Sequence, residues 1–529
     1  MTRAWLRVTL VSLAILGLLA SAGAAAPPPP TVKISLPPSP LTEEQKILHV
    51  LNRLGYGPRP GDVERVKVMG LAAYIQQQLY PQAIPDAAVA QKVKNLSTLG
   101  MTPAELMKEF PRPDPKALQK VKDGEMSREE LREMFPPEKR PMRIVGELQA
   151  AKLIRAVESA RQLEEVMVDF WFNHFNVFAG KGAVKWMLIS YEQDAIRPHA
   201  LGKFRDLLLA TARHPAMLFY LDNWMSVRND FPSRPEGKGP KGLNENYARE
   251  LMELHTLGVD GGYTQKDVIE VARCFTGWTI DRPRDGGGFV FRPVAHDNGE
   301  KVVLGHRIPA GGGQRDGEMV IDILARHPST AKFIATKLVR RFVADEPPAA
   351  LVARVADTYT RTDGDIRAML VTVVTSPEFF ATATYHAKIK KPFELVASAV
   401  RAVGGTTSPS PALSRAVAQI GEPLYAYQPP TGYPDVAEAW VNTGALLNRL
   451  NFALGLTENR YPGVRVDLGR FVSDADRRDP AQLLDRLIEG LLHNQVAPET
   501  REILLRQVTD PEVEKIAALV LGSPEFQRR

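Results

Sequence analysis

The spacing of apolar residues along this chain predicts a protein built mainly from α-helices. Thr42 followed by Gln45 is the pattern of a capped helix start. The stripe behind that start consists of Ile47, Leu48, Leu51 and Leu54. The same periodicity predicts helices at residues 62–79, 144–178 (broken once), 190–213, 244–257, 264–277, 318–342, 349–360, 364–374, 392–403, 442–456 and 480–520.

One segment has the pattern of β-strands. Apolar runs within residues 289–304 flank Asn298 and Gly299, and Asn-Gly is a strong two-residue hairpin turn. The expected fold class is therefore a mainly α, multi-helix globular body with one small β-hairpin insertion.

The first residues have the three-part layout of a secretory signal. Arg3 and Arg7 precede an apolar run at residues 8–20, and small residues lead to Ala26. The alternative is a retained membrane anchor, but the run is shorter than the roughly 20 residues that a spanning helix needs. We expect a signal peptide at residues 1–26 and an exported protein, periplasmic or extracellular, with no membrane span after cleavage.

The rest of the chain is expected to form one unit. Residues 27–42 are proline-rich and predict an extended tether. Residues 43–529 would be a single helical domain, with a C-terminal helical subregion at 405–529. Residues 99–143 are charged and punctuated by prolines, which predicts a partly mobile insertion containing short helices.

Charge and cysteine content narrow the possible functions. The net charge of +6 is spread along the chain without a basic stripe, which argues against nucleic acid as a partner. The single Cys274 excludes an intrachain disulfide and is expected to pack as a small hydrophobic residue.

Two predicted helices carry the residues most suited to chemistry. At about 100° per residue, Glu165, Asp169, Asn173 and Asn176 share one face of the first helix. Glu245, Asn246, Arg249 and Glu253 share a face of the second, with Glu250 beside them. His174 and His255 lie on the apolar side of their respective helices.

Three interpretations of these faces compete. They are solvated surfaces supported by i,i+4 ion pairs such as Glu245–Arg249. In the second interpretation they form a carboxylate-bridged metal site, although Glu253 and His255 lie on opposite sides of a regular helix and could not bind the same ion. Or they form an acid–base site in a cleft, with Asp169, Glu245, Glu250 and Glu253 as acid–base candidates and Arg249, Asn173, His174 and His255 in support.

Two further segments are candidates. His296 and Asp297 stand at the expected hairpin tip and are either turn residues or a functional pair. Residues 425–440 are rich in aromatic residues and proline; they either line a groove suited to sugar rings or pack as a loop over the helices.

Several of these segments together resemble a known bacterial family. The residues that carry the resemblance are LNRLGYGP (51–58), DFWFNHFNV (169–177), ENYARELMELHTLG (245–258), GGYT (261–264), FTGW (275–278), His296-Asp297, Lys301, Leu304-Gly305 and PPTGYP (429–434). They resemble the family called domain of unknown function 1800 over nearly the whole expected mature chain. The resemblance implies export, a helical fold and frequent genetic neighbourhood with the family called domain of unknown function 1501, whose members look like sulfatase or alkaline-phosphatase relatives. It implies no particular reaction.

The leading functional hypothesis is a carboxylate-based hydrolase or lyase that acts on an envelope or extracellular polymer. The first alternative is a non-catalytic binding or maturation partner of the co-encoded sulfatase- or phosphatase-like protein. The second is a metal-dependent oxidoreductase, although the sequence specifies neither a metal nor a cofactor.

Overall fold

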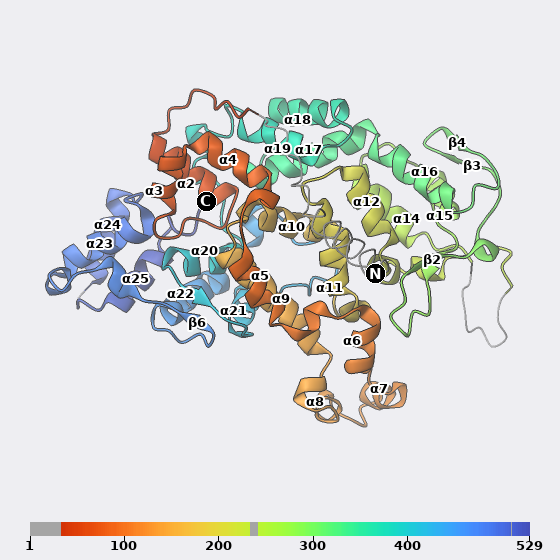
Figure 1. Ribbon diagram of the computed structural model, residues 1–529, viewed down its shortest axis with the longest axis horizontal. Helices are drawn as coiled ribbons and strands as arrows, with labels where there is room; N and C mark the ends of the chain where they lie inside the picture. The colour runs from red at the N-terminus through yellow and green to blue at the C-terminus, as the bar shows by residue number, and fades with distance from the viewer. Residues whose placement is uncertain (1–32, 233–241, 509) are drawn as a thin grey trace, which may run out of the picture. The chain divides into compact units, whose positions relative to one another are not determined.

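The computed structural model describes residues 33–232, 242–508 and 510–529, and Ile34–Arg529 forms one compact unit. The expected signal peptide at 1–26 and residues 27–32 of the expected tether lie outside the described residues. Helices dominate the unit, which confirms the mainly α fold class (Figure 1). None of the helices described is both long and apolar enough to cross a membrane.

The first half of the unit is a succession of short and medium helices. They are α2 (Glu43–Arg53), α3 (Asp62–Met69), α4 (Leu71–Leu79), α5 (Ala87–Lys94), α6 (Pro103–Glu109), α7 (Pro115–Lys122), α8 (Arg128–Glu133), α9 (Met142–Glu158), α10 (Gln162–His174), α11 (Leu188–Ser190), α12 (Phe204–Arg213), α13 (Pro215–Tyr220), α14 (Asn246–Glu250) and α15 (Gln265–Cys274).

The second half continues in the same way. Its helices are α16 (Gln314–Ala325), α17 (Pro328–Phe342), α18 (Ala349–Arg361), α19 (Ile366–Val374), α20 (Pro392–Ala402), α21 (Ala412–Ile420), α22 (Thr443–Thr457), α23 (Pro480–Leu492), α24 (Pro498–Gln507) and α25 (Val513–Gly522).

The predicted start of the first helix is confirmed in detail. The Thr42 side chain accepts a hydrogen bond from the Gln45 backbone N–H at 3.2 Å, and the Gln45 side chain accepts one from the Thr42 N–H at 3.0 Å. The expected single break in residues 144–178 is also present, between α9 and α10. Cys274 is buried on α15, and burial raises the pKa of its thiol.

Two of the predicted helices contain π-helical turns, so the assumption of regular helices was wrong there. These turns are η5 (Tyr191–Ile196) and η9 (Leu251–Thr256), and η9 continues directly from α14. In η9 the Leu257 N–H donates to the Met252 carbonyl, five residues back, at 2.7 Å. The wider turn changes the angles between side chains, and such turns are frequent at functional sites.

The prediction of a β-hairpin in this region is confirmed, but the predicted position of its turn was wrong. Within the described residues there are three two-stranded antiparallel sheets, which pair β1 (Trp278–Ile280) with β2 (Phe289–Phe291), β3 (Lys301–Val303) with β4 (His306–Ile308), and β5 (Thr406–Thr407) with β6 (Val464–Arg465). The tight hairpin is β3–β4, with Leu304 and Gly305 at positive φ in its turn. Asn298 and Gly299 instead precede β3, and the Gly299 N–H donates to the Asp297 carboxylate.

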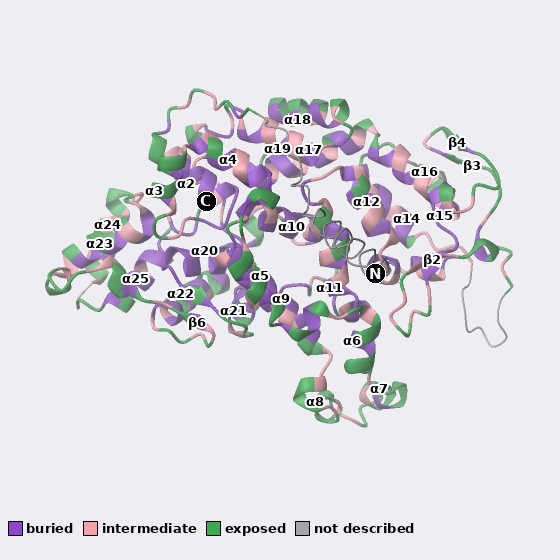
Figure 2. Ribbon diagram, viewed as in Figure 1, coloured by how far each residue is buried: buried purple, intermediate pink, exposed green. Residues whose placement is uncertain are grey.

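The expected insertion at 99–143 contains the short helices α6, α7 and α8. Helix α8 buries none of its residues and α7 buries only Ala117. Figure 2 shows these two helices largely in the exposed colour, in contrast to α9.

Helix α20 is buried along its entire length, from Pro392 to Ala402, and contacts α9, α21 and α22. Its apolar residues explain this position, because a helix that is hydrophobic all round belongs in a core. It also carries Glu394, Ser398 and Arg401 into that core, and buried polar groups need partners.

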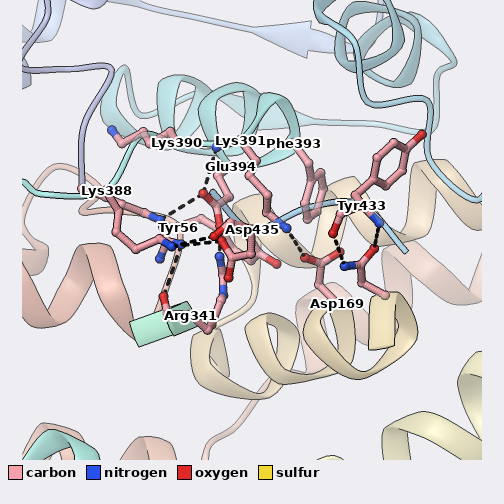
Figure 3. A network of polar contacts seen from close by, with 12 residues as sticks. Tyr56, Asp169, Arg341, Lys388, Lys390, Lys391, Phe393, Glu394, Tyr433 and Asp435 are labelled. Carbon is pink, nitrogen blue, oxygen red and sulfur yellow. Dashed lines mark hydrogen bonds and ion pairs between the residues drawn. The ribbon is translucent and has the colours of Figure 1, made fainter. Parts of the chain in front are cut away.

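The partners of α20 form a buried network of charged side chains, part of which is drawn in Figure 3. Glu394 pairs with Arg341 of α17 and, at 3.0 Å, with Arg529. Burial alone would raise the pKa of Glu394, but Arg341 and Arg529 hold it well below its usual value. The network therefore links α17, α20 and the last residues of the chain through compensated charges.

This network predicts an unequal cost for two carboxylate-to-amide substitutions. Glu394→Gln leaves two buried arginines without their carboxylate, and breaking a buried ion pair costs about 3–5 kcal/mol. Glu378→Gln removes the partner of the more exposed Arg354, for which about 1 kcal/mol or less is expected. Thermal unfolding of both variants measures the difference, and equal shifts in melting temperature would contradict the role given to Glu394.

Candidate functional site

The polar face of α10 points into the protein. Glu165 and Asp169 are 7% and 8% exposed. Arg197 donates two hydrogen bonds to Glu165, at 2.7 and 2.9 Å. Asp169 pairs with Lys152 at 2.7 Å and with Lys391 at 3.7 Å. The interpretation of this face as a solvated surface is therefore wrong.

The polar face of α14 and η9 lies nearer the surface. Glu245 accepts hydrogen bonds from Arg249 at 3.2 Å and from Gln265 at 2.7 Å, so the predicted i,i+4 pair is present. Glu253 accepts a hydrogen bond from the Tyr263 hydroxyl at 3.0 Å. Burial, reinforced by Glu253, raises the pKa of the half-buried Glu250.

His174 and His255 lie next to each other, a contact that the sequence left possible. The His174 Nε2 lies 3.0 Å from the backbone carbonyl of His255, and the two ring centroids are 6.1 Å apart. Burial lowers the pKa of His255 to about 3 and that of His174 well below its usual value, so both rings are neutral near pH 7.

A cavity of about 330 Å³ opens beside His174. Helix α10 contributes Phe170, Asn173 and His174. Residues 425–440, called the aromatic segment below, contribute most of the remaining wall, including Tyr427 and Tyr433. None of Glu245, Glu250 and Glu253 lines this cavity. Of the eight residues singled out as candidates, the structure thus brings Asn173 and His174 to a shared space, with Asp169 reaching it through Lys391.

The wall of this cavity has an excess of positive charge. Lys337, Arg340 and Arg341 of α17 and Lys391 face Asp435 as the carboxylate of the lining. Arg341 and Lys391 already pair with buried carboxylates, and Asp435 lies 3.2 Å from Lys388. Lys337 has no carboxylate within 4.0 Å among the residues described, and burial lowers its pKa to about 8.

Asn173 fixes the aromatic segment to α10. Its side-chain amide donates to the Tyr433 carbonyl at 2.8 Å and accepts from the Tyr433 N–H at 2.7 Å. One turn further, Asn176 donates to the carbonyls of Tyr427 and Pro429. Gly432 makes this approach possible, because its φ is +69° and a Cβ there would overlap the carbonyl oxygen of Asn173.

Lys391 stands between two buried carboxylates whose pKa values shift in opposite directions. Its Nζ lies 3.7 Å from Asp169 and 3.9 Å from Glu422. Burial raises the pKa of Glu422 to about 7. Burial would also raise that of Asp169, but Lys152 and Lys391 lower it. Figure 3 shows Lys391 extending from the start of α20 towards Asp169.

Sequence reasoning missed the cations of the cavity and Glu422. Lys337 lies on an ordinary amphipathic helix, and lysines of the kind found at 388–391 are usually solvated. The one available signal was Pro392 directly after two lysines and before an apolar helix, which marks a helix start. It does not reveal that the whole start is buried.

The remaining candidates from the sequence, His296 and Asp297, pair with charged side chains inside the protein. His296 Nε2 lies 3.1 Å from Asp316, and Lys301 donates to the same carboxylate at 2.5 Å, with all three side chains fully buried. Asp297 pairs instead with Arg273, at 2.8 Å. Within the described ranges, no group of three or more His, Cys, Asp or Glu side chains is arranged to hold a metal ion.

These features define a mainly α protein with a buried charge network and a cationic cavity lined in part by an aromatic segment. The chain belongs to the family described as protein of unknown function (DUF1800), whose model matches residues 49–528. The resemblance of the sequence motifs to that family is thereby confirmed. No curated protein and no solved structure matches the chain.

The contact between Gly432 and Asn173 gives a direct test of how the cavity wall is held. Gly432→Ala should displace the aromatic segment, because the added methyl group meets the backbone of α10. Gly262→Ala is the matched control: its φ is +85°, with no atom within 4 Å of the added Cβ, so it carries only the left-handed backbone cost of about 1–2 kcal/mol. Thermal unfolding and limited proteolysis within 427–436 should separate the two variants, and identical behaviour would argue against the clamp.

Proposed function

We propose that this protein is an exported binding protein that takes an anionic sugar unit of an envelope or extracellular polymer into the cavity beside α10. The observation that carries the proposal is the unbalanced positive charge of the wall, above all Lys337, which lacks a carboxylate partner among the described residues. Lys337 is half-buried. A cation partly withdrawn from water without a counterion is costly, and a ligand carboxylate, sulfate or phosphate would supply the missing charge.

The aromatic side of the cavity supports a sugar as the carrier of that anion. The Tyr427 and Tyr433 rings are neighbours, with centroids 4.3 Å apart, and both line the cavity. Aromatic rings combine an apolar face with a polar edge, which suits the mixed surface of a sugar ring. The segment is held rigidly by Asn173 and Asn176, so little ordering would be needed on binding.

Export is part of the proposal and depends on residues 1–26 as a signal peptide. A binding protein of this kind is also compatible with a role beside a co-encoded sulfatase- or phosphatase-like protein of the domain of unknown function 1501 family. Such an enzyme would act on the same anionic groups.

Affinity electrophoresis through gels containing alginate, dextran sulfate or neutral dextran, at 150 mM salt, tests the binding. We expect retardation by at least one of the two anionic polymers and none by dextran. Lys337→Gln should weaken that binding at least tenfold because it removes the uncompensated charge. Lys332→Gln, on an exposed position of the same helix, should change it less than twofold. Absence of binding, or equal effects of the two substitutions, would rule the proposal out.

A hydrolase or lyase acting at the same cavity is the second candidate, and one observation favours it. Asp169 and Glu422 flank Lys391 with pKa values shifted apart, the usual condition for a pair in which one carboxylate is ionised while the other holds a proton. Glu422, which does not line the cavity itself, would supply the proton through Lys391, which does, and Asp169 would hold Lys391 in place.

This candidate predicts turnover of the bound polymer that falls as the pH rises above about 7, where Glu422 loses its proton. Glu422→Gln should abolish the release of new polymer ends while leaving binding within threefold, and Glu438→Gln, exposed in the aromatic segment, should retain both. If the wild-type protein binds a polymer without shortening it, the protein is a binding protein alone.

A further inference from the structure

A second cavity, larger than the one beside α10, lies away from the site described above, where the insertion meets the body of the protein. It has a volume of about 1000 Å³. Its walls are α8 with the segment that follows it, the start of α9, Lys185 with Trp186, and residues 409–415. None of its lining residues lines the cavity beside α10.

The floor of this cavity is apolar. Leu131, Phe135, Met142 and Trp186 line it, and Met142 is 60% exposed. Helix α8 buries none of its residues against the protein, and the adjacent Met134 is 57% exposed. Of the lining residues, Met142 is thus exposed, and Leu131 and Phe135 are half-buried. Apolar side chains that line a concave site in this way mark a ligand-binding surface more often than chance exposure.

The rim is strongly cationic. Arg128, Arg132, Lys185 and Arg415 line the cavity, and none has a carboxylate within 4.0 Å in the described part of the chain. Glu147 is the lining carboxylate, and it is already bonded to Arg143 at 2.7 Å and to Thr98 at 2.9 Å. The positive charge is therefore available to an anionic ligand.

The walls offer few backbone hydrogen-bond donors to a bound peptide. Five of the lining residues are prolines, which have no N–H to donate: Pro113, Pro137, Pro141, Pro409 and Pro411. The N–H groups of α8 and α9 beyond their first turns are used within those helices. An extended peptide, which needs backbone partners, is thus poorly served, whereas an acyl chain needs none.

We propose that this cavity binds an anionic phospholipid, with an acyl chain over Leu131, Phe135 and Trp186 and the phosphate among the guanidinium groups of the rim. Guanidinium groups suit phosphate because they form paired, charge-assisted hydrogen bonds. The half-buried Lys185 adds a further cation next to the indole of Trp186, 5.4 Å from its ring centroid.

Isothermal titration calorimetry tests the proposal. The whole purified protein is titrated with lysophosphatidylglycerol below the critical micelle concentration of this lipid. We expect binding of this lipid and at least tenfold weaker binding of the zwitterionic lysophosphatidylcholine and of glycerol 3-phosphate. Arg128→Glu with Arg132→Glu should weaken lysophosphatidylglycerol binding at least tenfold. The charge-matched control, Arg477→Glu with Arg478→Glu at exposed positions elsewhere, should change it less than twofold.

A second variant tests the apolar floor. Leu131→Asp changes a half-buried residue of the exposed helix α8 and should abolish lipid binding while leaving the melting temperature within a few degrees. Equal affinity for the two lysolipids, equal affinity for glycerol 3-phosphate, or equal effects of the two double substitutions would overturn the proposal. Tighter binding of an acidic amphipathic helical peptide than of the lipid would overturn it in favour of a protein partner. The anionic-sugar site can fail or succeed independently, because Lys337→Gln does not touch this cavity.

Discussion

The compensation of charge around the buried helix α20 is the constraint on which the rest of the structure depends. A helix without an exposed face must satisfy each polar group that it carries inside the protein. Glu394 does so through Arg341 and Arg529, whereas Arg401 donates to the carbonyls of Gly57 and Val157 and to Asp62. These partners come from separate parts of the sequence, so the position of α20 determines where α17, the start of α3 and the residues around 157 and 529 lie.

The same requirement produces the cationic cavity. Lys388, Lys390 and Lys391 precede α20 and are each at most 5% exposed. Each has a different form of stabilisation: Lys388 pairs with Asp345 and Asp435, Lys390 donates to Ser398 and lies over the Phe526 ring, and Lys391 lies between Asp169 and Glu422. Lys337, by contrast, has no carboxylate within 4.0 Å among the residues described, and its side chain lines the cavity.

The sequence predicted well those features that depend on neighbouring residues. The capped start at Thr42 and the break between α9 and α10 follow from local chemistry and periodicity, and both are present. The hairpin turn was misplaced because Asn298-Gly299 matches a turn locally, while Leu304-Gly305 takes positive φ values within the pairing of β3 with β4. The π turn at η9 was missed because its residues have ordinary helical character.

The site was only partly predictable for a related reason. Asn173, His174 and the aromatic segment were singled out, and they do meet around one cavity. Asp169 was expected on a polar face beside solvent or a cleft, whereas the structure places it between two lysines from α9 and from the start of α20. No pattern within α10 reveals that Lys391, more than two hundred residues away, lies beside Asp169. Glu422 and Lys337 were missed because no local pattern relates them to α10.

The wide sequence separation of these partners has a consequence for how the chain reaches its folded state. Arg53 donates to the carbonyl of Thr384, Lys388 pairs with the backbone of Arg529, and Asp169 meets Lys391. Contacts of such long range close large loops and form slowly. A nascent chain lacking its last segments leaves Glu394 without Arg529, so a compact state cannot be completed early in synthesis. Delayed compaction is compatible with the proposed export, in which the polypeptide would cross a membrane while still unfolded.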